Sequence, residues 1–141
     1  EASVLPLAGL TALQALQLAK VKAGDRVFIQ AGAGGVGHIA VQLAKLKGAI
    51  VITTAEKHNH AFLAELGADQ CIDFRSADFT EVITEQVDVV IDLIGAQVGI
   101  KSLVVLAENG CMVSVPTISA KRSYCRRRRT TKASIRYGGE I

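Results

Sequence analysis

The stretch of sequence that decides the fold runs Arg26-Val27-Phe28-Ile29-Gln30-Ala31-Gly32-Ala33-Gly34-Gly35-Val36-Gly37. Its first five residues are rich in branched and aromatic side chains, which predicts a short strand. Beyond the glycines, apolar residues recur at helical spacing from residue 36 to residue 46 and predict a helix. A strand, a glycine-rich turn and a helix in this order are the setting in which Gly-x-Gly-x-x-Gly binds a dinucleotide.

The three glycines of this motif have separate physical tasks. Gly32 allows a tight exit from the strand, Gly34 leaves the backbone bare for a pyrophosphate, and Gly37 lets the helix pack close to the strand. The backbone N–H groups near Gly35 and Val36 then face the phosphates with the positive end of the helix dipole. The alternative is a glycine turn that serves packing only.

Strands and helices alternate on both sides of this unit. A helix is predicted over about residues 6–21, and further strands over 49–54, 70–74, 87–94 and 111–115. Helices are predicted from Asn59 to Gly67, around 79–84, and over 98–106 with its end at Asn109-Gly110. The fold class is therefore α/β, a Rossmann-type doubly wound parallel sheet in the strand order 3-2-1-4-5, with a sixth strand left undecided.

Charge divides the chain into two unequal parts. Residues 1–120 carry 8 Lys/Arg against 12 Asp/Glu, a net −4, whereas residues 121–141 carry 8 against 1, a net +7. We predict a dinucleotide-binding domain over residues 1–118 and a basic tail over 119–141 that is disordered or loosely docked. Nucleic-acid binding by Arg126 to Arg129 is not expected, because the run lacks stacking aromatic residues.

Composition excludes several classes of protein. No apolar run reaches the roughly 18 to 20 residues that cross a bilayer, and the first residues lack a secretion signal, so we expect a cytoplasmic protein without membrane contact. Cys71, Cys111 and Cys125 are widely spaced, which indicates reduced thiols rather than disulfides or a zinc site. His58 and His60 have no third ligand nearby in the sequence, so metal binding is not expected there.

The residues after the second strand bear on cofactor choice. An acid at this place accepts from the ribose hydroxyls of NAD, whereas a cation accommodates the 2′-phosphate of NADP. Glu56 lies near the expected place, Lys57 follows it, and Thr53 and Thr54 precede it. The residues alone leave the choice open, and Glu56 with Lys57 could equally be a solvated pair.

Two other residues allow a functional and a structural interpretation. Asp92, near the end of the fourth strand, could be catalytic, but a carboxylate there more often anchors a loop. Cys125 lies among arginines that would lower the pKa of its thiol, yet a solvated thiol is the simpler interpretation.

Several separate motifs accompany the glycine turn in a fixed order. They are Leu5-Pro6-Leu7-Ala8-Gly9-Leu10-Thr11-Ala12, Gly24-Asp25-Arg26-Val27, Ala31 to Gly37, and Leu66-Gly67-Ala68-Asp69. Over about residues 3–116 the chain resembles the medium-chain dehydrogenase/reductase superfamily, and within it the zinc-independent quinone oxidoreductases. The resemblance implies hydride transfer to a quinone or enone with NADPH as the donor, NADH as the alternative, and no zinc.

The resemblance also assigns cofactor-binding residues by position. It implies Thr11 near the nicotinamide; Ala33, Gly34, Gly35 and Val36 at the pyrophosphate; Thr54 and Lys57 at the adenosine phosphate; Ile94 and Gly95 at the inner ribose; and Val115 and Pro116 near the nicotinamide amide. Glu56 departs from the family, which often has a small hydroxyl residue there, and an acid would repel a 2′-phosphate unless Lys57 dominates.

The family's N-terminal barrel-like domain, which forms the substrate side of the cleft, has no counterpart in this chain. We therefore assign no catalytic residue and expect a fragment that is inactive alone. The arginine-rich end also departs from the family, and we hypothesise a frameshift or altered end from about Ala120. Family members often form homodimers through the sheet edge. The alternatives are a non-catalytic nucleotide-sensing domain and an S-adenosylmethionine-dependent methyltransferase.

Overall fold

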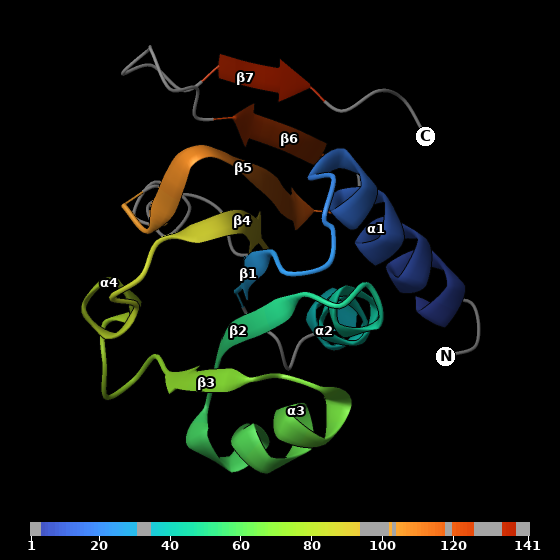
Figure 1. Cartoon of the computed structure of the whole chain (residues 1–141). Coiled ribbons are helices and arrows are strands. Elements are labelled where there is room, and N and C mark those ends of the chain that lie inside the picture. Colours follow the sequence, from blue (N-terminus) through green and yellow to red (C-terminus); the bar gives the residue numbers. More distant parts are fainter. Residues whose placement is uncertain are drawn as a thin grey trace.

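The chain forms one mixed sheet, described by a computed structural model for residues 4–30, 35–93, 102, 104–117, 120–125 and 134–137. The strand order is β3-β2-β1-β4-β5-β6-β7 (Figure 1). The strands are β1 (Arg26–Ile29), β2 (Ile50–Ala55), β3 (Gln70–Asp73), β4 (Val87–Asp92), β5 (Leu106–Thr117), β6 (Ala120–Cys125) and β7 (Ser134–Tyr137). The first five are parallel, which confirms the predicted order 3-2-1-4-5.

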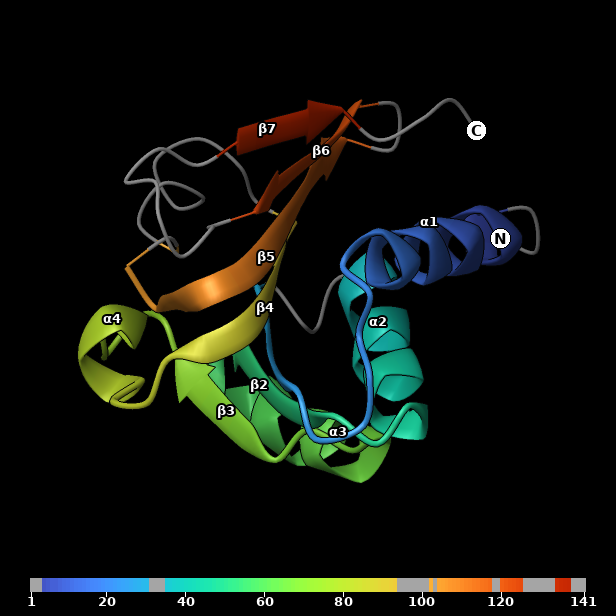
Figure 2. The same ribbon diagram turned by 45° about the horizontal axis from the view of Figure 1, so that its top comes forward.

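Helices cover both faces of the sheet, as a doubly wound fold requires. They are α1 (Val4–Leu18), α2 (Gly35–Leu46), α3 (His60–Leu66) and α4 (Phe79–Val82), with a short 3-10 helix η1 (Lys57–Asn59) before α3. Figure 2 shows α1 and α2 on one side of the strands and α4 on the other. In the part of the chain that is described, no helix is both long and apolar enough to cross a membrane.

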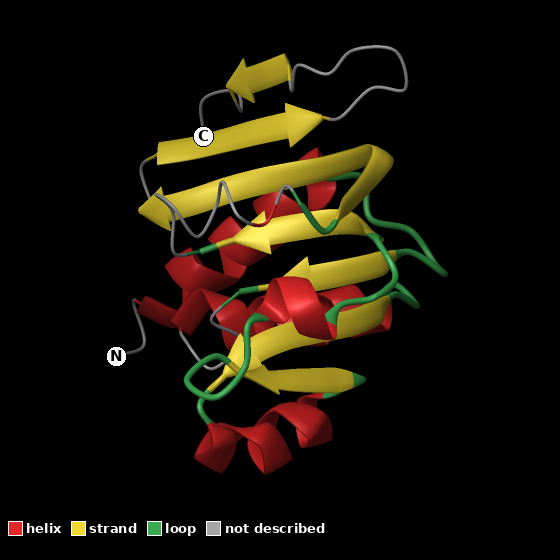
Figure 3. Cartoon of the chain, turned by 90° about the vertical axis from the view of Figure 1, so that its left-hand side faces the viewer, coloured by secondary structure: helices red, strands yellow, loops and turns green. Residues whose placement is uncertain are grey.

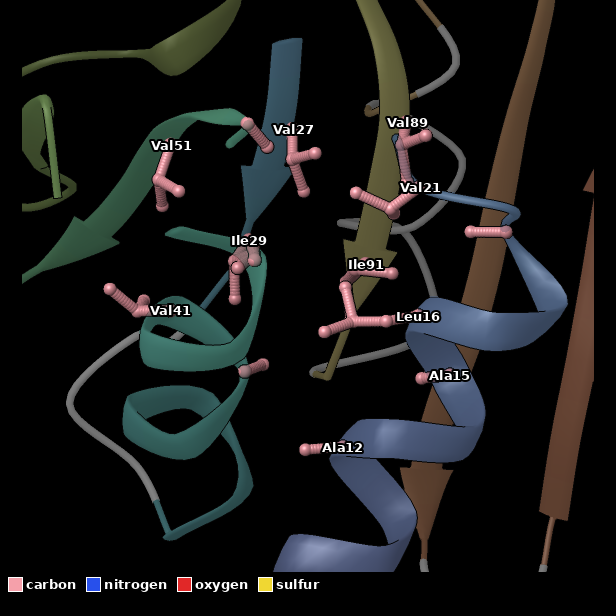
Figure 4. Packing of buried hydrophobic residues seen from close by; sticks show 14 of the residues in the cluster. Ala12, Ala15, Leu16, Val21, Val27, Ile29, Val41, Val51, Val89 and Ile91 are labelled. Atoms are coloured by element: carbon pink, nitrogen blue, oxygen red, sulfur yellow. The ribbon is translucent and has the colours of Figure 1, made fainter. Parts of the chain in front are cut away.

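A hydrophobic core lies on each face of the sheet, and β1 contributes side chains to both. Successive residues of a strand point to opposite faces. Val27 and Ile29 pack in the core beneath α1 and α2, together with Leu16 of α1 (Figure 4). Phe28 points the other way and packs against Phe79 of α4, with 5.0 Å between the ring centroids and 43° between the ring planes. These three side chains of β1 are fully buried, which identifies β1 as a central strand.

The helix predicted over 98–106 falls largely outside the described residues, and its predicted end at Asn109-Gly110 is wrong. Both residues belong to β5, which begins at Leu106. The register explains the difference: Val87 pairs with Leu106 but Val89 pairs with Cys111, so β5 carries extra residues in a bulge. A Cβ at Gly110 would lie 2.7 Å from Leu106 Cδ1, so the glycine permits this close approach rather than ending a helix.

Helix α3 has the predicted bounds but not the predicted N-terminal hydrogen bond. Gly67 ends the helix with φ 115°, and its N–H donates to the carbonyls of Ala64 and Leu63, as expected of a C-terminal glycine. Asn59 occupies the N-cap position, but its side chain makes no capping hydrogen bond. Its backbone belongs to the preceding turn η1, with φ −94° and ψ −6°, which is not the extended geometry of a typical cap.

Residues beyond Pro116 include two strands where the sequence predicted no regular structure. β6 pairs antiparallel with β5 and β7 antiparallel with β6, so both extend one side of the sheet (Figure 3). Pairing at an edge needs backbone N–H and C=O groups but no apolar side chains, so a charged sequence carries no signal for it. The undecided sixth strand is thus antiparallel, and the domain boundary at residue 118 stays a prediction.

Candidate functional site

The carboxyl ends of β1, β2 and β4 meet at one edge of the sheet. Ile29 is in register with Thr53 of β2 and with Ile91 of β4. The Thr53 hydroxyl donates to the carbonyl of Ile29 at 2.7 Å, and the N–H of Gln30 donates to the carbonyl of Ile91 at 3.1 Å. In open α/β sheets, ligands bind just outside this edge at the point where the strand order reverses.

Helix α2 points its N-terminus at this edge. It begins at Gly35, which is exposed, and an added Cβ there would meet no atom within 4 Å. Its first turn carries no acidic side chain, so the positive end of the helix dipole is not offset by a carboxylate of that turn. The predicted pyrophosphate residues Gly35 and Val36 are in this turn, whereas Ala33 and Gly34 lie outside the described residues.

The residues predicted to lie near the adenosine part of the cofactor are at the end of β2 or just after it. Thr54 is in register with Ile72 of β3 and is only 4% exposed, so its side chain has little free surface. Lys57 is exposed in η1. Glu56 stands between them, with a side chain that is 34% exposed.

Both carboxylate oxygens of Glu56 have basic partners. Oε1 lies 2.7 Å from Nη2 of Arg75, and Oε2 lies 3.3 Å from Nδ1 of His58, an ion pair when that imidazole is protonated. Arg75 is not among the cofactor-binding residues predicted from the sequence. The signal was present, because the predicted order sets the end of the third strand beside the end of the second, and Arg75 follows that end by two residues.

The turn after β3 holds Arg75 in place. The Asp73 carboxylate accepts from the N–H of Arg75 at 3.0 Å, while the Asp73 carbonyl accepts from the N–H groups of Ser76 and Ala77. The hydrogen bond from the backbone N–H of Arg75 is the main reason why the pKa of Asp73 lies below its usual range. An aspartate that binds a backbone N–H two residues on is the usual way to build such a turn.

The two histidines of this region have different partners. His58 faces Glu56, whereas Nε2 of His60 donates to the carbonyl of Ala55 at 3.0 Å and ties α3 to the end of β2. Within the ranges described, no group of three or more His, Cys, Asp or Glu residues could hold a metal ion.

The remaining predicted residues are on α1, at the ends of β4 and β5, or outside the described residues. Thr11 is 1% exposed on α1, and helical spacing puts it on the same buried face as Ala15. Asp92, the last residue of β4, is also 1% exposed, which favours its structural interpretation over contact with a substrate. Val115 and Pro116 lie in β5, beyond Ser114, which pairs with Asp92. Ile94 and Gly95 fall outside the described residues.

Known proteins match the chain over most of its length. The zinc-binding dehydrogenase family matches residues 35–139. A 2-haloacrylate reductase from Burkholderia sp. is 44% identical over 113 residues, which are 75% of this chain and 34% of the reductase. The structure of a quinone oxidoreductase from Coxiella burnetii aligns with a TM-score of 0.77 and 65% identity, over 80% of this chain and 36% of that one.

A solved structure with cofactor is also similar. The Escherichia coli quinone oxidoreductase complexed with NADPH aligns with a TM-score of 0.72 and 35% identity, over 77% of this chain and 35% of that one. The present chain thus spans only about a third of the length of these relatives. The matched residues, the strand order and the identities agree that the chain belongs to the zinc-binding dehydrogenase family of the medium-chain dehydrogenase/reductase superfamily, on its quinone oxidoreductase-like side.

Proposed function

We propose that this chain is the NADPH-binding part of an oxidoreductase that reduces a quinone or an enone. The observation that carries the proposal is the convergence, at one sheet edge, of the open N-terminus of α2 and the cations that follow β2 and β3. Relatives that share this fold at 35% identity or more include a quinone oxidoreductase complexed with NADPH.

The residues of the edge fit such a cofactor. The N–H groups of Gly35 and Val36 would donate to the oxygens of a pyrophosphate at the start of α2, where the missing Cβ of Gly35 leaves room. Lys57 would attract the adenosine 2′-phosphate. Ala33 and Gly34, Ile94 and Gly95, and Thr11 with Val115 complete the proposed set at the pyrophosphate, the inner ribose and the nicotinamide. Bound NADPH supplies a hydride, and the chain's own residues hold and orient the cofactor.

Thr54 contributes mainly by positioning the end of β2 in this proposal. Its side chain is nearly buried and it stands in register with Ile72 of β3, so it supports the edge at which the adenosine ribose would bind. Thr53 anchors β2 to β1 through its hydroxyl and fixes the level at which the two strands end. Both threonines therefore support the site more than they contact the 2′-phosphate.

Substrate and activity belong to the whole protein, because the matched part of this chain is only about a third of the relatives' length. We propose that catalytic groups lie on sequence outside this chain and that the domain turns over no substrate alone. The reduced cysteines Cys71 and Cys111 fit a cytoplasmic protein. A homodimer through the outer strand β7 is the proposed assembly, and size-exclusion chromatography with light scattering tests it.

Calorimetric titration of the chain with NADPH, NADH and S-adenosylmethionine tests the cofactor assignment. We expect a saturating binding isotherm with NADPH, weaker binding of NADH and no binding of S-adenosylmethionine. A preference for NADH would overturn the NADPH assignment, and binding of S-adenosylmethionine alone would favour a methyltransferase. Binding of NADPH without quinone or enone reduction by the full-length gene product would favour a nucleotide-sensing domain.

A further inference from the structure

We infer that Arg75 is a specificity-determining residue that turns the acidic end of β2 into a site for a 2′-phosphorylated adenosine. The inference rests on the proposed nucleotide-binding function and names a residue outside the proposed contact set. It starts from a conflict in the sequence: Glu56 stands where an acid would select an unphosphorylated ribose.

The position of the Glu56 carboxylate resolves this conflict. An acid selects the ribose by accepting from its hydroxyls, which requires free carboxylate oxygens. Here Oε1 is held at 2.7 Å by Arg75 and Oε2 lies 3.3 Å from His58. The guanidinium therefore competes directly with a ribose for the oxygens of Glu56.

The charge at this edge points to the same conclusion. Two carboxylates, Glu56 and Asp73, and two permanent cations, Lys57 and Arg75, lie at or just after the ends of β2 and β3, so these four residues are together neutral when His58 is uncharged. Without Arg75 the same cluster would carry a net −1 and would repel a phosphate dianion. Lys57 alone cannot offset two acids, so Arg75 decides whether the net charge of the cluster is zero or negative.

The guanidinium is also accessible and well placed. The Arg75 side chain is 71% exposed, so donors that do not bind Glu56 remain open to solvent or ligand. Ala55 of β2 is in register with Asp73 of β3, which puts the residues after both strands at the same level of the sheet edge. The Asp73 turn fixes the backbone of Arg75 there. An arginine fork suits bidentate binding of a phosphate.

An exposed ion pair of this kind adds little to stability, so its residues can be changed without loss of the fold. A role of the pair in phosphate binding can therefore be tested separately from a role in stabilising the fold. If the pair served only to clamp the turn, removing either partner would have the same effect. If the charge of Arg75 recognises phosphate, removing Arg75 and removing Glu56 must act in opposite directions.

The test titrates the whole 141-residue chain with 2′,5′-ADP and with 5′-AMP, which differ only in the 2′-phosphate. We expect Arg75→Gln to weaken 2′,5′-ADP binding about tenfold and to change 5′-AMP binding less than twofold. Glu56→Gln should strengthen 2′,5′-ADP binding. Lys45→Gln is the matched control, because Lys45 pairs with Asp69 at 2.9 Å at the other end of these strands, and it should change neither affinity.

Each outcome has a distinct meaning. Equal losses for both ligands in Arg75→Gln, or the same loss in Glu56→Gln, would overturn the role of Arg75 and leave the proposed function standing. Failure of the unaltered chain to bind either ligand would instead overturn the proposed function and, with it, this inference. Circular dichroism of each variant checks that the fold is retained.

Discussion

Lys45 and Asp69 join helix α2 to the start of strand β3, with 2.9 Å between Nζ and Oδ1. The same carboxylate accepts from the N–H of Val51 at 2.8 Å, so it also connects β3 to β2. Burial raises the pKa of Asp69, but the hydrogen bonds from Val51 and Lys45 outweigh it and hold the pKa below its usual range.

This relationship predicts an acid-dependent part of the stability. Because the folded-state pKa of Asp69 lies below the unfolded value of 3.8, its contribution is present above that pH and is lost as pH falls through the folded pKa. Solvent screens the partly exposed pair, so we expect Asp69→Asn to cost about 1 kcal/mol or less at pH 7. Urea unfolding at pH 7 and about pH 3 measures this.

The loss caused by Asp69→Asn should shrink at the lower pH. Glu65→Gln, which removes an exposed acid of α3, is the control and should have little effect at either pH. An equal loss at both pH values would show that Asp69 acts through packing rather than charge.

Gly67 and Gly24 form a matched pair for testing backbone strain and side-chain collision. Both have positive φ, 115° and 87°, so alanine at either position costs about 1–2 kcal/mol of strain. At Gly67 the new Cβ would also lie 2.7 Å from Cγ of Lys45, whereas at Gly24 it would meet nothing within 4 Å. We expect Gly67→Ala to be the more destabilising by about 1 kcal/mol. Equal melting temperatures for the two variants would contradict this.

The aromatic pair on the α4 face predicts a large core effect. Phe28 is fully buried and packs against Phe79, so Phe28→Ala leaves a cavity and should lower the free energy of unfolding by about 3–5 kcal/mol. Phe62→Ala is the comparison, because Phe62 is 46% exposed and should cost about 1 kcal/mol or less. Denaturant titration followed by circular dichroism distinguishes the two.

The first residue of α2 offers a direct test of phosphate binding. Gly35→Asp adds a negative charge where the site needs a positive potential, and we expect NADPH affinity to fall about tenfold or more relative to Gly35→Asn. The fold should persist, because an acid at a helix N-terminus is favourable and the new side chain has open space. Identical affinities for the Asp and Asn variants would argue against a phosphate at this helix.

The sequence predicts the elements that have a local signal. The pattern of branched side chains predicts a strand over 87–94, which the structure has over Val87–Asp92, and it also predicts the strand before the glycine turn. The end of α3 at Gly67 is predicted because the backbone there needs a glycine. The end of a helix at Asn109-Gly110 was a wrong prediction, because asparagine followed by glycine also suits a strand bulge. The outer strands β6 and β7 were missed because backbone pairing leaves no apolar period in the sequence.

The candidate site was predictable to a similar extent. The glycine turn directly follows the strand before it, and Glu56 directly follows β2, so both have a local signal in the sequence. The pairing of Glu56 with Arg75 depends on residues 19 apart in the sequence and on the Asp73 turn, which sequence spacing alone does not specify. Tertiary contacts between loops are the part of a site that a single sequence specifies least.

The position of β1 between β2 and β4 has a consequence for synthesis on the ribosome. β1 can pair with β2 once residue 55 has emerged, but its other edge waits for residues 87–92. Until then, an apolar strand presents unpaired N–H and C=O groups to other chains. Nascent chains released before Val87 are therefore expected to aggregate, and an early-acting chaperone would be needed longest while the segment between these two strands is translated.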